Sequence, residues 1–285
     1  MESGVYLTIV SSSDKSSIKV SIIQFNAGAD KAVNLKKIQS LLDQAIKEKP
    51  DLICLPEVFN LRTGRDQSIS EAENIPDGES TKLLCDFALK NKVWISNGSI
   101  FEKVENGLPY NASILINDKG QVVEKYRKNH LFKASFKDHE IDEGNKSQAC
   151  SQTCVANFTK DELKLGIGMS ICYDLRFPEL YRGYAKQKAQ IILVPSSFAK
   201  KTGEAHWESL LRARAIENQC FVIAANQWGT VNDLETYGNS MIIDPWGKIL
   251  ERASFDQDEV ISAELDIHYL NEVRESLPAL YHMKS

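Results

Sequence analysis

Strand-length apolar runs alternate with stretches of helical period from residue 18 onward. The run IKVSIIQF at 18–25 predicts a buried strand, because apolar residues fill it almost continuously. Apolar positions at helical spacing follow Asp30, which we expect to cap a helix that Pro50 ends. The run DLICLPE at 51–57 predicts a second strand. This opening therefore predicts a β-α-β unit with parallel strands.

The same alternation continues to the end of the chain. A polar, irregular segment at 133–160 interrupts it and indicates a loop over the surface or over a site. No repeat or linker divides the sequence, so we expect one domain at 18–285 after an N-terminal extension at 1–17. Sheets packed face to face with helices outside are the simplest architecture for this pattern. In order, the expected elements are a helix at 79–90, strands in KVWISNGSIF, NASILIND, QVVEKYR and LKLGIGMSI, a helix at 177–188, a strand in QIILVP, a helix at 204–218, a strand in CFVIAA, a hairpin in GNSMIIDPWGKIL, a strand in EVISAEL and a helix at 267–276.

Composition and charge narrow the class of protein. Hydrophobic residues make up 42% of the 285 residues and charged residues 26%, as in globular proteins rather than disordered or coiled-coil chains. The net charge of −5 comes from mixed signs, without the basic stripe that a nucleic-acid partner requires. The apolar runs are shorter than the roughly 20 residues that span a bilayer, and the N-terminus lacks the basic start of an export signal. We expect neither nucleic acid nor membrane as a partner.

The cysteines indicate a reducing compartment and single out one thiol. Six cysteines are too few for a disulfide scaffold of this length, which favours a cytoplasmic location. Cys150 and Cys154 form a C-x3-C pair with no matching Cys or His pair nearby, so loop thiols are favoured over a metal site. Cys172 is different, because it stands where a buried strand gives way to charged residues.

Three side chains that could act as base, cation or nucleophile follow the ends of predicted strands. They are Glu57, Lys128 and Cys172. Ligand sites collect at that edge of sheets in proteins that also contain helices. A free thiol has a pKa of about 8.5, so it needs a base or a cation to react at neutral pH. Glu57 could take the proton from Cys172, while Lys128 and the backbone N–H of Tyr173 could stabilise an oxyanion. This combination predicts acyl transfer from an amide.

Other readings of these residues stay open. A Cys-His pair is the alternative catalytic arrangement, with His130 or His206 as the base. Arg214 lies on the apolar face of its helix, so we expect it to be partly buried and paired, with Glu217 available three residues on. A structural duty is favoured for Arg214 over substrate contact.

Three motifs resemble those of the nitrilase superfamily of carbon-nitrogen hydrolases: LPEVFN, KYRKNHLF and GMSICYDLRFPEL. Two further stretches, TGEAHWESLLRARAIENQCFVIAANQWG and YGNSMIIDPWG, look like the branch that contains deaminated glutathione amidase and omega-amidase. The resemblance implies an α/β fold arranged as a four-layer α-β-β-α sandwich, no metal or cofactor, and a homodimer or higher homo-oligomer. It makes Glu57 the general base, Lys128 the oxyanion partner and Cys172 the nucleophile.

The family also places a further glutamate after the lysine motif, several residues before a glycine. Here the stretch KDHEIDEGN is shorter than the usual spacing to Gly144. Glu140 is the first choice for this position, with Asp138 and Glu143 behind it.

The substrate is expected to be a small linear carboxamide. Arg176 lies four residues after Cys172, and the YDxRF pattern of the branch implies that it binds a substrate carboxylate. Pocket-lining residues are expected in 133–145 and around Phe198 to Thr202. The first prediction for the activity is that of a deaminated glutathione amidase, and the second is that of an omega-amidase acting on 2-oxo acid amides. An N-carbamoyl amide hydrolase, a nitrilase and a catalytically silent interaction scaffold are the remaining alternatives.

Overall fold

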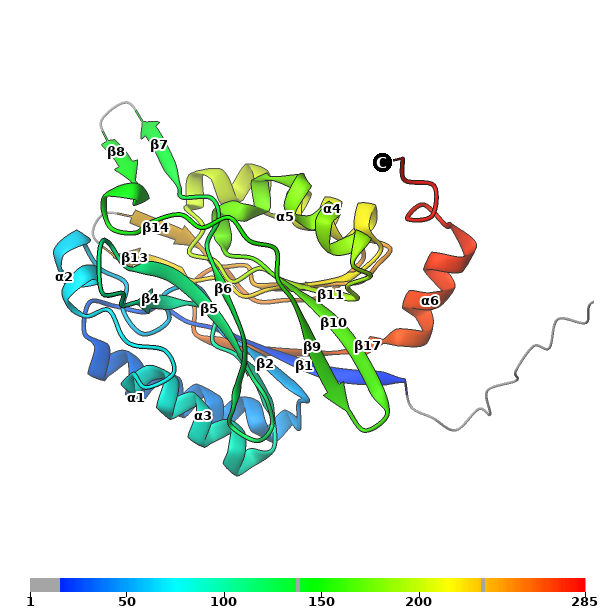
Figure 1. Ribbon diagram of the computed structural model, residues 1–285, viewed down its shortest axis with the longest axis horizontal. Helices are drawn as coiled ribbons and strands as arrows, with labels where there is room; N and C mark the ends of the chain where they lie inside the picture. Colours follow the sequence, from blue (N-terminus) through cyan, green and yellow to red (C-terminus); the bar gives the residue numbers. More distant parts are fainter. Residues whose placement is uncertain (1–15, 137–138, 232–233, 285) are drawn as a thin grey trace, which may run out of the picture.

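Two β-sheets lie face to face with helices on their outer sides (Figure 1). The computed structural model describes residues 16–136, 139–231 and 234–284. These four layers confirm the α/β class and the α-β-β-α sandwich. In the part of the chain that the structure describes, no helix is long and apolar enough to cross a membrane. The covering helices are α1 (Lys31–Ala45) and α3 (Glu79–Asn91) on one sheet, and α4 (Pro178–Lys186) and α5 (Lys200–Asn218) on the other.

Within the described ranges, these two sheets have seven and six strands. The first sheet runs in the order β17 (Glu259–Asp266), β1 (Ser17–Gln24), β2 (Leu52–Cys54), β3 (Trp94–Ser96), β5 (Tyr110–Ile116) and β4 (Ile100–Glu102), and β6 (Val122–Arg127) also pairs with β5. The second sheet runs in the order β16 (Ile249–Arg252), β15 (Met241–Ile243), β12 (Phe221–Ala224), β11 (Ile191–Leu193), β10 (Leu163–Met169) and β9 (Val155–Lys160).

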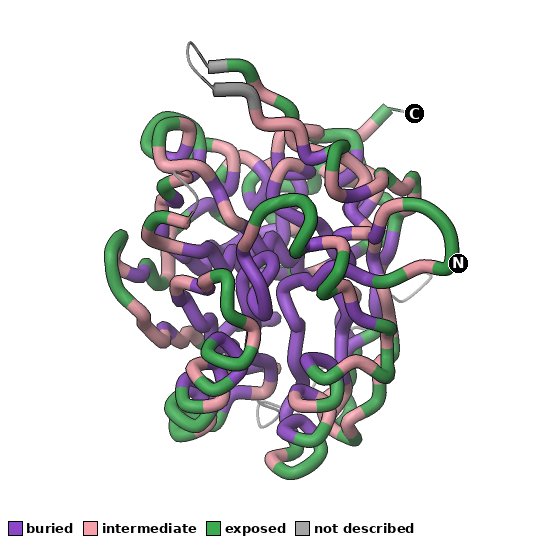
Figure 2. The backbone as a smooth tube through the Cα atoms, turned by 90° about the vertical axis from the view of Figure 1, so that its left-hand side faces the viewer, coloured by how far each residue is buried: buried purple, intermediate pink, exposed green. Residues whose placement is uncertain are grey.

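The N-terminal β-α-β unit is confirmed. Strands β1 and β2 pair in parallel, and Asp30 caps α1 by accepting a hydrogen bond from the Val33 N–H at 3.0 Å. The continuous apolar run of β1 is explained by burial on both of its faces. Ile22 belongs to the core between the sheets, whereas Ile23 belongs to the core under α1. Figure 2 shows the buried backbone gathered in the centre of the molecule, with exposed residues around it.

The segment KVWISNGSIF is not one strand but two. β3 and β4 both pair antiparallel with β5 and are separated by an interruption at 97–99, in which Gly98 has φ +71°. A Cβ at this position would collide with the carbonyl of Pro56, so both the backbone angle and the close approach require glycine. At this interruption the chain lies against the segment that carries Glu57.

Several short elements were not expected from the sequence. The segment at 133–160 is not a simple loop, and a further hairpin and a short helix lie elsewhere in the chain. Each is held by pairing and tertiary contacts more than by a strong apolar period of its own. They are β7 (Lys133–Phe136), β8 (His139–Asp142), η2 (Glu143–Asn145) and β9 within the segment, and α2 (Arg65–Ser70), β13 (Trp228–Val231) and β14 (Leu234–Tyr237) outside it.

The chain ends with α6 (Ile267–Ser276), close to its expected range. The expected extension at 1–17 falls mostly on residues 1–15, which lie outside the described residues. The division into an extension and one domain therefore stays a prediction.

Candidate active site

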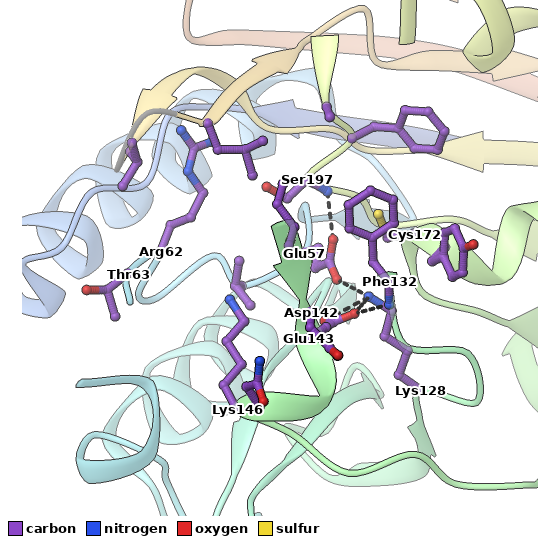
Figure 3. A pocket seen from close by; sticks show the side chains of 18 of the residues that line it. Glu57, Arg62, Thr63, Lys128, Phe132, Asp142, Glu143, Lys146, Cys172 and Ser197 are labelled. Atoms are coloured by element: carbon purple, nitrogen blue, oxygen red, sulfur yellow. Dashed lines mark hydrogen bonds and ion pairs between the residues drawn. The ribbon is translucent and has the colours of Figure 1, made fainter. Parts of the chain in front are cut away.

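Glu57, Lys128 and Cys172 lie in one pocket of about 720 Å³, as Figure 3 shows. Glu57 follows β2 and Lys128 follows β6, both strands of the first sheet. Cys172 opens the short helix η3 (Cys172–Arg176), which follows β10 of the second sheet. The site therefore sits where strand ends of the two sheets meet.

Lys128 bridges two carboxylates. Its Nζ lies 2.9 Å from Glu57 Oε1 and 2.7 Å from Glu143 Oε2, and the lysine is 1% exposed. Burial alone would lower the pKa of Lys128, but the charges of Glu143 and Glu57 outweigh it and raise that pKa well above its ordinary value. The lysine is therefore a fixed cation at any physiological pH.

Glu143 supplies the carboxylate after the lysine motif that contacts Lys128. The spacing alone makes Glu140 the first choice for this position. The Glu143 Oε2 also accepts from the Phe132 N–H at 2.8 Å. Glu140 lies three residues earlier in β8, where its backbone is paired with Ser135, and its side chain is outside the described part of the structure. Asp138 is outside the described residues as well. The β7–β8 hairpin takes up the residues before Glu143, and η2 then turns Glu143 back onto Lys128.

Glu143 is held in its charged form. Burial tends to raise its pKa, but the charge of Lys128 and the hydrogen bonds from Lys128 and the Phe132 N–H lower it below the ordinary value for glutamate. One cation thus compensates two close carboxylates.

Asn111 of β5 is a site residue that the sequence analysis missed. Its Nδ2 lies 2.9 Å from Glu57 Oε1 and 3.3 Å from Glu143 Oε1, so one amide group ties the two carboxylates together. The side chain is 1% exposed, and its Oδ1 has no hydrogen-bond partner among the described residues. An amide side chain in the largely apolar run YNASILI was the available signal.

Cys172 is a buried thiol on a strained backbone. It has φ +48°, uncommon for a residue other than glycine, and its N–H donates to the Pro195 carbonyl at 2.9 Å. Burial and the carboxylate of Glu57 raise the pKa of the thiol well above its ordinary value, while Lys128 and the backbone N–H of Ser197 act in the opposite direction. The resting state is therefore the neutral thiol, with a carboxylate available to take its proton.

A buried acid fixes the turn that carries this thiol. Asp174 is fully buried and accepts from the Ile171 N–H at 2.9 Å, from the Tyr126 hydroxyl at 2.7 Å and from the His130 N–H at 3.0 Å. The His130 Nδ1 lies 2.7 Å from the same carboxylate, and its ring stacks on Phe177.

Neither histidine takes the place of a base next to the thiol. His130 is engaged with Asp174, and the His206 Nδ1 lies 3.2 Å from an Arg176 nitrogen. Among the described residues, the lining of the pocket includes neither histidine. The geometry therefore favours Glu57 over a Cys-His pair.

Arg214 is buried and paired, as expected. Its guanidinium donates to the Leu175 carbonyl at 2.8 Å and lies 2.9 Å from Glu217. Leu175 belongs to η3, so Arg214 ties α5 to the turn that carries Cys172.

A family model described as Carbon-nitrogen hydrolase matches residues 19–275. The chain belongs to this family. The resemblance of the three motifs to the nitrilase superfamily is thereby confirmed.

Similar proteins agree with this assignment. A deaminated glutathione amidase of Dictyostelium discoideum is 37% identical over 279 residues, which cover 93% of this chain and 94% of that protein. The omega-amidase NIT2-B of Xenopus laevis is 35% identical over 267 residues, which cover 91% of this chain and 92% of that protein. The crystal structure of the C. elegans NitFhit protein matches with a TM-score of 0.87 and 32% identity, covering 95% of this chain and 66% of the longer NitFhit chain.

The pocket of this carbon-nitrogen hydrolase contains all the residues expected to contact substrate. Tyr173, Arg176, Phe198 and Thr202 line it, and the Arg176 guanidinium lies 5.2 Å from the Phe198 ring centre. Among the described residues, the charged side chains that line it are five cations and three carboxylates. The cations are Arg62, Arg65, Lys128, Lys146 and Arg176, and the carboxylates are Glu57, Asp142 and Glu143.

Proposed function

We propose that this chain is an amidase that hydrolyses the C–N bond of a small linear carboxamide through a thioester on Cys172. The observation that carries the proposal is the buried ion pair of Lys128 with Glu57 in a pocket that Cys172 also lines. A base, a cation and a nucleophile in one place are what acyl transfer from an amide needs. The family match and the amidases among the similar proteins support the same reaction.

The first half of the reaction breaks the C–N bond. The Cys172 sulfur attacks the amide carbonyl carbon while Glu57 accepts the thiol proton. The Lys128 ammonium and the Tyr173 N–H stabilise the negative charge that develops on the carbonyl oxygen. Glu57 then gives its proton to the leaving nitrogen, and the amine departs, as ammonia when the substrate is a primary amide.

The second half releases the acid. Water attacks the thioester carbonyl carbon, and Glu57 accepts a proton from it. The C–S bond breaks, and the proton on Glu57 returns to the Cys172 sulfur. Glu57 acts as base and acid in turn, so the enzyme ends in its starting protonation state.

Glu143 fills the second glutamate position in this proposal, in place of Glu140. Its charge keeps Lys128 protonated, and together with Asn111 it fixes the geometry of Lys128 and Glu57. An oxyanion partner must stay charged and stationary during the reaction, and these contacts provide both properties.

The first substrate candidate is deaminated glutathione, and an omega-amide of a 2-oxo acid is the second. Relatives named for both activities support them. Both substrates carry a carboxylate, which Arg176 would bind between the Tyr173 and Phe198 rings. Thr202 and Phe198 would contact the remainder of the substrate. N-carbamoyl amides and nitriles need the same nucleophile and differ from these substrates in pocket shape.

The test is release of amine or ammonia from a panel of amides by the purified protein, with Cys172→Ala as the control. The panel contains deaminated glutathione, the omega-amide of 2-oxoglutarate, an N-carbamoyl amino acid and a nitrile. Release that requires Cys172 supports the proposal, and the preferred amide identifies the substrate. No release from any of them, by a folded protein, would favour the silent scaffold.

A cytoplasmic location and a homodimer or larger homo-oligomer are further parts of this proposal. Light scattering on the purified protein measures its mass and would test the second of them.

A further inference from the structure

Arg62 is a buried cation without a carboxylate partner in the described part of the structure. It is 7% exposed and lines the pocket. Its Nη1 donates to Thr236 Oγ1 at 2.9 Å and to the Trp228 carbonyl at 3.3 Å, and its Nη2 donates to the Gly229 carbonyl at 3.1 Å. Among the described residues, neither the hydrogen on Nε nor the second hydrogen on Nη2 has an acceptor. One edge of the guanidinium therefore remains available.

Burying a guanidinium without a counter-charge is unfavourable. Burial lowers the pKa of Arg62 to about 10, which still leaves it charged at neutral pH. Neutral oxygens hold the group in place but do not compensate its charge. A carboxylate would do both, because its two oxygens match two parallel N–H groups of arginine.

Arg274 shows what a purely structural arginine looks like in this fold. It donates to the Gln219 carbonyl at 2.9 Å and to the Ala189 carbonyl at 2.7 Å. It is absent from the pocket lining that the described residues form. Arg62 makes the same kind of backbone contacts, but it borders the cavity in which substrate is expected.

Arg62 and Arg176 reach the pocket from different parts of the fold. Arg176 lies in η3 with Cys172 and packs against Tyr173 and Phe198. Arg62 belongs to the segment after β2 and contacts the β13–β14 hairpin. Figure 3 shows Arg62 across the pocket from Cys172. A substrate with a negative group at each end of its amide would meet one arginine at each end.

We propose that Arg62 binds a second carboxylate of the substrate, carried by the amine portion that leaves when the C–N bond breaks. This inference rests on the proposed amidase function. The acyl portion is short if its carboxylate reaches Arg176 beside the nucleophile, so the group that extends across the pocket belongs to the amine. The excess of cations in the lining, within a chain of net charge −5, fits an anionic substrate with more than one carboxylate.

The test compares two substrates that differ only at this end. Both have 2-oxoglutarate joined through its distal carboxyl group to a dipeptide, glycylglycine in one and glycylglycinamide in the other. The rate of dipeptide release gives kcat/KM for each substrate. The ratio of the two kcat/KM values is taken within one variant, so a smaller fraction of folded enzyme lowers both values equally and leaves the ratio unchanged.

We expect the wild type to prefer the free carboxylate by about tenfold to a hundredfold, the range of a charge-assisted hydrogen-bonded pair. Arg62→Met should lose this preference and act on the amidated substrate about as the wild type does. Arg274→Met is the control, since it removes a partly buried guanidinium bonded to carbonyls, and it should keep the preference. A wild type without preference, or Arg62→Met with its preference intact, would overturn the subsite even if both substrates are hydrolysed.

A binding measurement separates this inference from the amidase proposal. The Kd of each intact amide is measured by calorimetry on Cys172→Ala and on Cys172→Ala combined with Arg62→Met. Discrimination that depends on Arg62 supports the subsite even if the wild type shows no turnover, in which case the amidase proposal fails alone. Equal Kd values for the two amides on Cys172→Ala would overturn the subsite.

Discussion

Replacing Glu57 by Gln separates two effects of this carboxylate on Cys172. Its charge is, after burial, the largest cause that raises the pKa of the thiol. In the proposed reaction the same carboxylate accepts the thiol proton. Glu57→Gln should therefore lower the pKa of Cys172, so that more thiolate forms at a given pH, and yet it should slow turnover because the base is gone.

Glu57→Gln should reduce both the catalytic rate and the free energy of unfolding. Loss of a general base slows a reaction by about a hundredfold to ten-thousandfold, and kcat/KM of Glu57→Gln should fall within that range. Glu57 Oε1 accepts from Lys128 Nζ and Asn111 Nδ2, each at 2.9 Å. Its Oε2 accepts from the Ser197 N–H at 2.8 Å. Glutamine has a single oxygen, so one of these sides loses its acceptor, at a cost of about 1–3 kcal/mol in the free energy of unfolding.

Two assays on the same variant check this reasoning. Amine release gives kcat/KM, and the rate of Cys172 alkylation by iodoacetamide against pH, followed by mass spectrometry of its peptide, reports thiolate formation. Because the thiol pKa is raised well above the ordinary value of about 8.5, alkylation of the wild type should still be increasing with pH above that value. In Glu57→Gln the same increase should begin at lower pH.

Glu143→Gln is the matched control. The charge of Glu143 also raises the pKa of Cys172, so this variant should shift alkylation to lower pH as well, but it keeps the base. Its kcat/KM should therefore fall much less than that of Glu57→Gln. Loss of a general base should lower kcat/KM by at least about a hundredfold. A Glu57→Gln enzyme that retained more than about a tenth of wild-type kcat/KM would therefore refute the assignment of Glu57 as the base.

Three further substitutions test other contacts of the site. Asn111→Leu removes the amide that joins the two carboxylates and should lower kcat by about tenfold or more without abolishing it, as steady-state kinetics would show. Arg214→Met should lower the free energy of unfolding by about 3 kcal/mol in urea titrations, because it leaves buried acceptors unpaired, whereas the exposed Arg212→Met should change it by less than about 1 kcal/mol. Arg176→Ala should raise KM about tenfold for an amide that carries an acyl-side carboxylate and leave KM for a neutral amide nearly unchanged; equal increases would contradict carboxylate binding.

The sequence was most informative where apolar burial alone decides structure. The continuous run of β1 is buried on both faces, and its pattern marks it as a central strand. A change from apolar to charged residues after a strand drew attention to Glu57 and Cys172. The strand before Lys128, β6, is already mixed in character, so for this lysine only its place after a predicted strand was visible.

Contacts made by short irregular segments were beyond the sequence. Glu143 reaches Lys128 only because the β7–β8 hairpin and η2 set its position, and residue spacing to Gly144 does not encode that path. Arg62 is similar, since it becomes buried through the β13–β14 hairpin, far away in the chain. Both depend on tertiary pairing that hydrophobic periodicity does not report.

The site is divided between the two sheets. Glu57, Asn111 and Lys128 come from strands or strand ends of the first sheet, whereas Cys172 and Ser197 follow strands of the second. Sliding of one sheet over the other by about the length of a hydrogen bond would separate base from nucleophile while leaving each sheet intact. Catalytic activity therefore depends on the alignment of the two sheets. Under mild denaturation, activity should be lost before circular dichroism records any loss of strand.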